Sequence, residues 1–420
     1  MHIITRNATA RQLEAAIAQN HKDLFFLDAR IKNGVTHQQD GLCWTYTEQE
    51  GAGTILFPAL SDNIAPLNTM MDFYQQHQGK NIGCWSLQPA ATAHLDVLLL
   101  ARGFQPGWQP CWMVLDLQTI NTSYLSPEGL HIAPDNETPL HTITALPYAD
   151  NNSNGSTGLQ HEDPAQVQRF VATLNGTIVA QTLLLFGGGV AGIYNVGVVP
   201  EARGKGIGKA IVNAACLYAR ENGYHYATLN ANPMGRPVYE QLGFQWIGDG
   251  LTWWITDDRL QSRPPDAAET ALAEAVGKGD MAALAAFAVA DLNKPLCNGM
   301  QLLELAVHCR QPASAEWLIS HGATCSALDA WNLGWKDRAA ALLAENPAEI
   351  NRLYGNFQYT LLHAAVDKND IALAQLALSA GPNLQITDAI HQSNALGWAN
   401  YLERTTIEAM IKAYQSAQGF

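Results

Sequence analysis

The spacing of apolar residues changes along the chain. Short strand-like runs alternate with helix-like ones over about the first 260 residues, and only helix-like spacing follows. Thr9 is expected to cap a helix running to about Gln19, and the apolar run Leu24–Asp28 is expected to form a strand. Other expected elements of the first 120 residues are strands at Leu42–Tyr46, Thr54–Phe57 and Ile82–Leu87, and a helix near Ala65–Gln76.

A second set of strands and helices follows residue 168. Asn175-Gly176 between two apolar runs predicts a hairpin with a type I′ turn, joining Arg169–Leu174 to Ile178–Phe186. A buried strand is expected over Ile193–Val199, and Tyr226–Asn230 is expected as another short strand. The pattern predicts an α/β fold up to about residue 260, with an all-α part behind it.

A basic glycine loop follows the strand Ile193–Val199 and opens a helix near Ile207. Its members are Arg203, Gly204, Lys205, Gly206, Ile207, Gly208 and Lys209. The first N–H groups of a helix have no intrahelical acceptor, and the helix dipole favours negative charge there. Glycines let a phosphate approach those N–H groups, and the basic residues add positive charge. The loop therefore predicts a phosphate-bearing ligand.

The spacing of the loop selects among phosphate-binding motifs. A Walker loop would need glycine at Arg203 and a hydroxyl at Ala210, and a dinucleotide fingerprint would need G-x-G-x-x-G. The pattern R-G-x-G-x-G instead resembles the acetyl-coenzyme A loop of the GNAT acetyltransferase superfamily, [QR]-x-x-G-x-[GA], through Arg203, Gly206 and Gly208. An incidental glycine-rich turn is the alternative.

Downstream residues extend this resemblance. Asn232, Tyr239, Gly243 and Phe244 match the GNAT pattern N-x-x-A-x-x-L-Y-x-x-x-G-F, with Gly235 and Val238 in place of the usual Ala and Leu. The resemblance implies that Tyr239 protonates the departing thiolate of coenzyme A and that Asn232 helps to hold the pantetheine arm. It also implies that the backbone at Val196, Val198 and Val199 aligns that arm. A core aromatic beside Phe244 is the alternative for Tyr239.

The first 120 residues resemble a degenerate GNAT-like half. Gly103-Phe104-Gln105 followed by Trp112 parallels Gly243-Phe244-Gln245 followed by Trp253. The first copy lacks the R-x-x-G-x-G loop, and Leu99 stands at the position of Tyr239. A structural or substrate-flanking role is expected there, without a second active site.

The general base is not identified by the sequence. The strand before the loop offers only Tyr194 and Asn195, where many GNAT enzymes carry a glutamate. His161, Glu162 and Asp163 form the nearest upstream titratable cluster, and a solvated loop is the alternative for them. The segment 121–168 is expected to form a wall of the acceptor pocket, with 150–158 as a mobile lid or a plain loop.

The last third resembles an ankyrin array. Thr360-Leu-Leu-His-Ala-Ala365 is similar to the ankyrin T-P-L-H-x-A pattern, and His363 is expected to be a structural hydrogen-bonding residue. Leucines recur at intervals close to the ankyrin period of about 33 residues, at positions 272, 303, 333, 362 and 396. About five repeats are expected, and a non-repetitive helical domain is the alternative. The expected domains are 1–120, 121–260, a linker at 261–268 and an ankyrin array at 269–420.

Composition narrows the function classes. The net charge of −14 argues against a nucleic-acid partner. The seven cysteines show no C-x-x-C and no cluster with histidine, so we expect reduced thiols, no metal site and a cytoplasmic location. The N-terminus lacks an apolar signal core, and no run is long enough for a membrane span.

The resemblance implies an acetyl-CoA-dependent N-acetyltransferase without a metal. Its acceptor would be a small amine, or a lysine or N-terminus of a protein, and the ankyrin face would recruit a protein partner. The alternative is a non-catalytic interaction protein whose GNAT domain only senses acyl-CoA.

Overall fold

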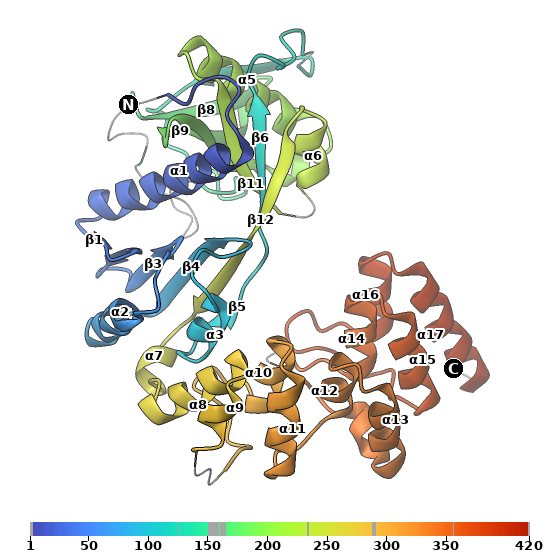
Figure 1. Cartoon of the computed structure of the whole chain (residues 1–420). Helices are drawn as coiled ribbons and strands as arrows, with labels where there is room; N and C mark the ends of the chain where they lie inside the picture. Colours follow the sequence, from blue (N-terminus) through green and yellow to red (C-terminus); the bar gives the residue numbers. More distant parts are fainter. Residues whose placement is uncertain are drawn as a thin grey trace. The chain divides into compact units, whose positions relative to one another are not determined.

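The computed structural model describes residues 3–124, 126–149, 159, 165–232, 235–287, 291–355 and 357–418. The chain forms two compact units, coloured along the sequence in Figure 1. The first unit holds Met1–Leu95 with Gly103–Pro264, and the second holds Asp96–Arg102 with Pro265–Phe420. A short segment of the N-terminal part therefore belongs to the helical unit. The boundaries expected at residues 120, 260 and 268 stay predictions.

The first helix is longer than the sequence predicts. α1 (Ala10–Ile31) begins after Thr9, whose hydroxyl accepts a hydrogen bond from the Gln12 N–H. The strand expected at Leu24–Asp28 is wrong, because the helix continues through it. The apolar run belongs to one buried stripe with helical spacing. That stripe includes Leu13, Ile17, Asn20, Leu24 and Leu27.

Strands and helices alternate after α1, as the sequence predicts. The elements are β1 (Val35–Gln39), β2 (Leu42–Thr47), β3 (Ala52–Leu56), α2 (Ala65–Gln76), β4 (Asn81–Leu87), α3 (Leu95–Leu100), β5 (Gln105–Pro106) and β6 (Cys111–Asp116). The helix expected at Ala65–Gln76 is confirmed, as are the strands expected near residues 42, 54 and 82.

The second set of elements carries the glycine loop. They are β7 (Leu130–Pro134), β8 (Val167–Leu174), β9 (Thr177–Gly187), β10 (Val190–Val198), η1 (Pro200–Ala202), α5 (Ile207–Glu221), β11 (Tyr226–Ala231), α6 (Arg236–Glu240), β12 (Gln245–Ile255) and α7 (Arg259–Ser262). The turn expected between β8 and β9 is confirmed, because Asn175 and Gly176 have φ of +50° and +83°.

One mixed sheet joins these two sets of strands, in the order β1-β2-β3-β4-β12-β6-β11-β10-β9-β8-β7, with β5 beside β12. β6 lies between β11 and the first half of β12, although it belongs to the first 120 residues. The second half of β12, Gly250–Ile255, pairs with β4. Each set of strands therefore contributes one strand segment to the sheet of the other (Figure 1).

Helices lie on both faces of the second sheet half. α5 packs against β8, β9 and β10 over an apolar core that includes Ile211 and Cys216, both fully buried. α1 contacts β9 and β10 and also β1, β2 and β3 (Figure 1). The N-terminal helix therefore packs on strands of both halves of the sheet.

The second unit is helical among its described residues. Its helices are α8 (Ala267–Lys278), α9 (Met281–Leu284), α10 (Leu302–His308), α11 (Pro312–Ser320), α12 (Ala327–Asn332), α13 (Lys336–Glu345), η2 (Pro347–Asn351), α14 (Leu361–Asp367), α15 (Ile371–Ser379), α16 (Ala395–Tyr401) and α17 (Thr405–Gln418). Successive helices pack in pairs, from α8 with α9 to α16 with α17. His363 is buried and bonds to Thr360 and to the Ser393 carbonyl, which confirms its structural role.

The segment Asp96–Arg102 packs on α8 within this unit. The buried Arg102 guanidinium lies 2.8 Å from the carboxylate of Glu274, which is partly buried. Val97 lies against Gly277, where an added Cβ would come within 2.6 Å of it. This segment therefore contributes to the packing of the first helices of the second unit.

Candidate functional site

Two parallel strands separate at the centre of the second sheet half. β10 pairs with β11 only through Ala191 with Ala227 and Gly192 with Thr228. Beyond these pairs the described residues of the two strands form no ladder, so the backbone groups at their carboxyl ends are not paired with each other. We call this place the opening between β10 and β11. The glycine loop follows the carboxyl end of β10, with the short helix η1 between them.

β10 contains a bulge just after this separation. Tyr194 pairs with Leu183 and Gly197 with Gln181, so β10 has one more residue than β9 over this stretch. Asn195, in the bulge, has a left-handed φ of +53°. The bulge turns the strand at the point where its edge becomes unpaired.

The glycine loop has the backbone that the sequence predicts for an anion site. Gly204 and Gly206 have φ of +74° and +79°, and Gly206 is the residue before the first turn of α5. An added Cβ at Gly204 would meet nothing within 4 Å, and one at Gly206 would meet only the Tyr124 hydroxyl, at 3.8 Å. The space in front of the first N–H groups of α5 is therefore open in the described part of the chain.

The basic side chains of the loop are held by the protein itself. The Nε of Arg203 donates to the Val198 carbonyl (3.1 Å), and the Nζ of Lys205 donates to the Glu201 carbonyl (3.0 Å). The Nζ of Lys209 donates to Gln241 just after α6 (2.8 Å), which ties the start of α5 to the segment that carries Tyr239. All three side chains remain accessible to an anion at the loop.

The groups available for ligand binding differ among the apolar residues expected at the site, which are Val196, Val198, Val199 and Ile207. The side chain of Ile207 is buried in the core, so only its backbone can face the loop. The Val199 N–H already donates to the Val179 carbonyl (2.9 Å). Val196 and Val198 are half-buried on the edge that leaves β11. These two residues are the better candidates for pairing with an extended ligand.

Tyr239 lies on α6 against the core. Its ring packs edge-on against Phe244, with 6.0 Å between ring centroids. Burial, and the nearby Tyr148, raise the pKa of the Tyr239 phenol to about 12. The hydroxyl is therefore protonated at neutral pH and can donate a proton. Asn232, in the preceding loop, is exposed and its Oδ1 accepts from the Gly235 N–H (2.6 Å).

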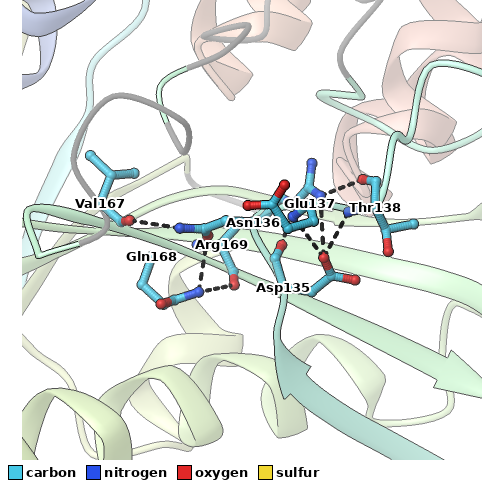
Figure 2. A network of polar contacts seen from close by, with 7 residues as sticks. All are labelled: Asp135, Asn136, Glu137, Thr138, Val167, Gln168 and Arg169. Carbon is cyan, nitrogen blue, oxygen red and sulfur yellow. Dashed lines mark hydrogen bonds and ion pairs between the residues drawn. The ribbon is translucent and has the colours of Figure 1, made fainter.

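The expected acceptor wall begins at an ordered network around Arg169 (Figure 2). Arg169 is 1% exposed, and its guanidinium donates to the carbonyls of Asp135 and Thr138. The Asn136 side chain accepts from the Arg169 N–H (2.7 Å), so residues 135–138 are fixed to β8. The segment 150–158 and the cluster His161, Glu162 and Asp163 lie outside the described residues.

Sequence reasoning missed one contribution to this region. Asn20, on α1, accepts a hydrogen bond from the Tyr194 hydroxyl (2.7 Å) across 174 positions of sequence. The signal available was a buried polar residue inside a helical stripe, but the helix was expected to end at Gln19. Among the described residues, no group of three or more metal-ligating side chains comes together, and no helix is both long and apolar enough to cross a membrane.

The parallel strands β10 and β11 separate beside a glycine loop at a helix N-terminus, an arrangement that suits a phosphate-bearing ligand. Residues 136–244 match the model of the acetyltransferase (GNAT) family. This part of the chain is therefore similar to the acetyltransferase domains of that family.

Individual relatives match a short part of the chain or match at low identity. A mycothiol acetyltransferase from Arthrobacter sp. (strain FB24) is 39% identical over 61 residues, which are 14% of this chain and 19% of that protein. The chain thus matches about a fifth of the length of this curated relative. A solved N-acetyltransferase from Kribbella flavida is 15% identical, with a TM-score of 0.46, covering 58% of this chain and 95% of its own. One from Sphaerobacter thermophilus is 12% identical, with a TM-score of 0.39, covering 57% and 92%.

Proposed function

We propose that the protein transfers an acetyl group from acetyl-CoA to an amine. The observation that carries this proposal is the opening between β10 and β11 with the Gly204–Gly208 loop at its end. In this proposal the first N–H groups of α5 and the side chain of Arg203 bind the pyrophosphate. The backbone of Val196 and Val198 pairs with the pantetheine arm as an added strand would.

Tyr239 is the proposed general acid. The acceptor nitrogen attacks the thioester carbonyl carbon, the carbon–sulfur bond breaks, and the electron pair leaves with sulfur. Tyr239 gives its proton to that sulfur and is reprotonated by the proton that the nitrogen loses, directly or through water. The phenol is protonated at neutral pH, so it holds the proton that this step requires. Asn232 is the proposed pantetheine contact.

We also propose that residues 269–420 are an ankyrin array that binds a protein partner. The successive packed pairs α8–α9 to α16–α17 and the Thr360–His363 capping box support this assignment. Such an array favours an acceptor amine on a protein over a small amine. None of the seven cysteines forms a disulfide, which favours a reducing, cytoplasmic location.

The second candidate is a domain that binds acyl-CoA without turnover. The observation that favours it is the absence of a carboxylate at Tyr194 and Asn195, on the strand before the loop. Incubating the protein and a whole-cell lysate with [14C-acetyl]-CoA tests both candidates. Enzyme-dependent label in protein or in small amines supports the transferase, and binding without label transfer supports the sensor.

A further inference from the structure

We propose that Asn20, from the N-terminal part that lacks the glycine loop, is a positioning residue for bound acetyl-CoA. It acts through Tyr194, whose position fixes the bulge of β10 at the opening between the strands. This inference rests on the proposed function, because it assigns a role in placing the acetyl-CoA that the opening would hold.

Asn20 is inserted into the sheet from α1. It is fully buried, and its amide nitrogen donates to the carbonyls of Gly187 (2.9 Å), Leu185 (3.1 Å) and Val190 (3.4 Å). Its Oδ1 accepts from the Tyr194 hydroxyl at 2.7 Å. One side chain therefore joins the β9–β10 hairpin to the residue that precedes the bulge.

Gly192 shows how close this approach is. An added Cβ at Gly192 would lie 2.0 Å from the Asn20 Oδ1 and 2.6 Å from the Tyr194 ring. Gly192 is also the last residue of β10 that pairs with β11. The amide of Asn20 thus occupies the space beside the backbone at the point where the two strands separate.

Tyr194 is held at both ends. Its backbone carbonyl accepts from the Thr182 hydroxyl (2.9 Å), and its own hydroxyl donates to Asn20. Burial, with Asp23 nearby, raises the pKa of the Tyr194 phenol, so this donor is kept over the whole neutral range. With both ends fixed, the left-handed turn at Asn195 and the edge at Val196–Val198 that follows it have one orientation.

In this proposal the two parts of the first unit contribute different elements to the acetyl-CoA site. The first 120 residues carry no glycine loop, yet they supply the side chain that sets the backbone along which acetyl-CoA would lie. Loss of one hydrogen bond in such a network leaves the fold in place, but a small displacement of a reacting group is costly to its chemistry.

The test uses two matched tyrosine-to-phenylalanine variants of the full chain. Tyr194→Phe removes the hydroxyl that Asn20 accepts from. Tyr74→Phe removes another internal phenol donor, which bonds to the Thr45 carbonyl at 3.0 Å in the N-terminal strands. The readouts are melting temperature, the Kd for acetyl-CoA by calorimetry, and the infrared carbonyl band of bound [1-13C-acetyl]-CoA.

We expect both variants to fold, with similar decreases in melting temperature. Tyr194→Phe should raise the Kd for acetyl-CoA about fivefold and move the carbonyl band toward its value in free solution. Tyr74→Phe should change neither the Kd nor the band. A folded Tyr194→Phe protein with the wild-type Kd and band overturns the positioning role alone. Failure of the wild-type protein to bind acetyl-CoA overturns the proposed function and this inference together.

Discussion

Replacing Tyr239 by phenylalanine removes one hydroxyl and keeps the ring that packs against Phe244. The cost in stability should be at most about 1 kcal/mol, the usual value of one hydrogen bond. If the phenol is the general acid, its loss should lower kcat by about 10²-fold, which corresponds to about 2.7 kcal/mol in the barrier. The effect on turnover therefore greatly exceeds the effect on folding.

The pH dependence of the wild-type protein supplies a second part of this prediction. Because the pKa of Tyr239 is raised to about 12, the proton donor is fully present below pH 10 and is lost only as pH rises toward 12. The rate should therefore show no decrease with an apparent pKa near 10, the ordinary value for tyrosine. A decrease centred near pH 10 that disappears in Tyr239→Phe would contradict the burial of this phenol.

Turnover is measured as thiol release from acetyl-CoA, with the acceptor identified in the labelling experiment. Calorimetry measures acetyl-CoA binding, and thermal melting measures stability. Tyr74→Phe again serves as the control, because it removes a buried hydroxyl far along the sheet from α6. Normal turnover by Tyr239→Phe would refute the general acid assignment. If neither protein transfers acetyl groups although both bind acetyl-CoA, the sensor is supported instead.

Three further perturbations test other parts of the structure. Gly206→Val should abolish acetyl-CoA binding, because valine disfavours the φ of +79° and its side chain enters the open space before α5. Unchanged affinity by calorimetry would contradict the loop assignment. The structure assigns Asp96–Arg102 to the helical unit. Truncation after residue 264 should therefore expose Leu98–Leu100 and cause aggregation on size-exclusion chromatography. Asp388→Asn should destabilise the helical unit by about 2 kcal/mol in urea unfolding, because the carboxylate accepts bonds from the N–H groups of Ile390, His391 and Ser393 and from the Trp398 indole. Burial favours a higher pKa for Asp388, but these hydrogen bonds lower it. The contribution of Asp388 to the free energy of unfolding is therefore full above pH 4 and decreases as pH falls further. This pH dependence should be absent in Asp388→Asn.

Local signals in the sequence predicted the parts of the site that lie close together along the chain. The glycine loop, the start of α5 and the Asn175-Gly176 turn each depend on residues within a few positions of one another. The run Leu24–Asp28 was misread for the same reason, because a short apolar run is equally compatible with a strand and with the end of a helical stripe.

Long-range relations could not be predicted in this way. The bond between Asn20 and Tyr194 spans 174 positions, and no local pattern marks either residue as the partner of the other. The packing of Asp96–Arg102 on α8 depends on tertiary contacts, although the apolar run Leu98–Leu100 is visible in the sequence. The fold class could therefore be predicted from the hydrophobic periodicity. The side chains that support the opening between the strands could not be predicted in this way.

The placement of β6 has a consequence for synthesis on the ribosome. Residues 111–116 are made early, but both of their neighbours in the sheet, β11 and the first half of β12, end near residues 231 and 249. At a synthesis rate of about 5–20 residues per second, on the order of ten seconds pass between the synthesis of β6 and that of its hydrogen-bonding partners. During that interval its apolar side chains and both strand edges are unpaired, and such segments associate readily with other chains. The nascent protein should therefore depend on chaperones until about residue 250 has emerged, and its N-terminal part should reach its final sheet only then.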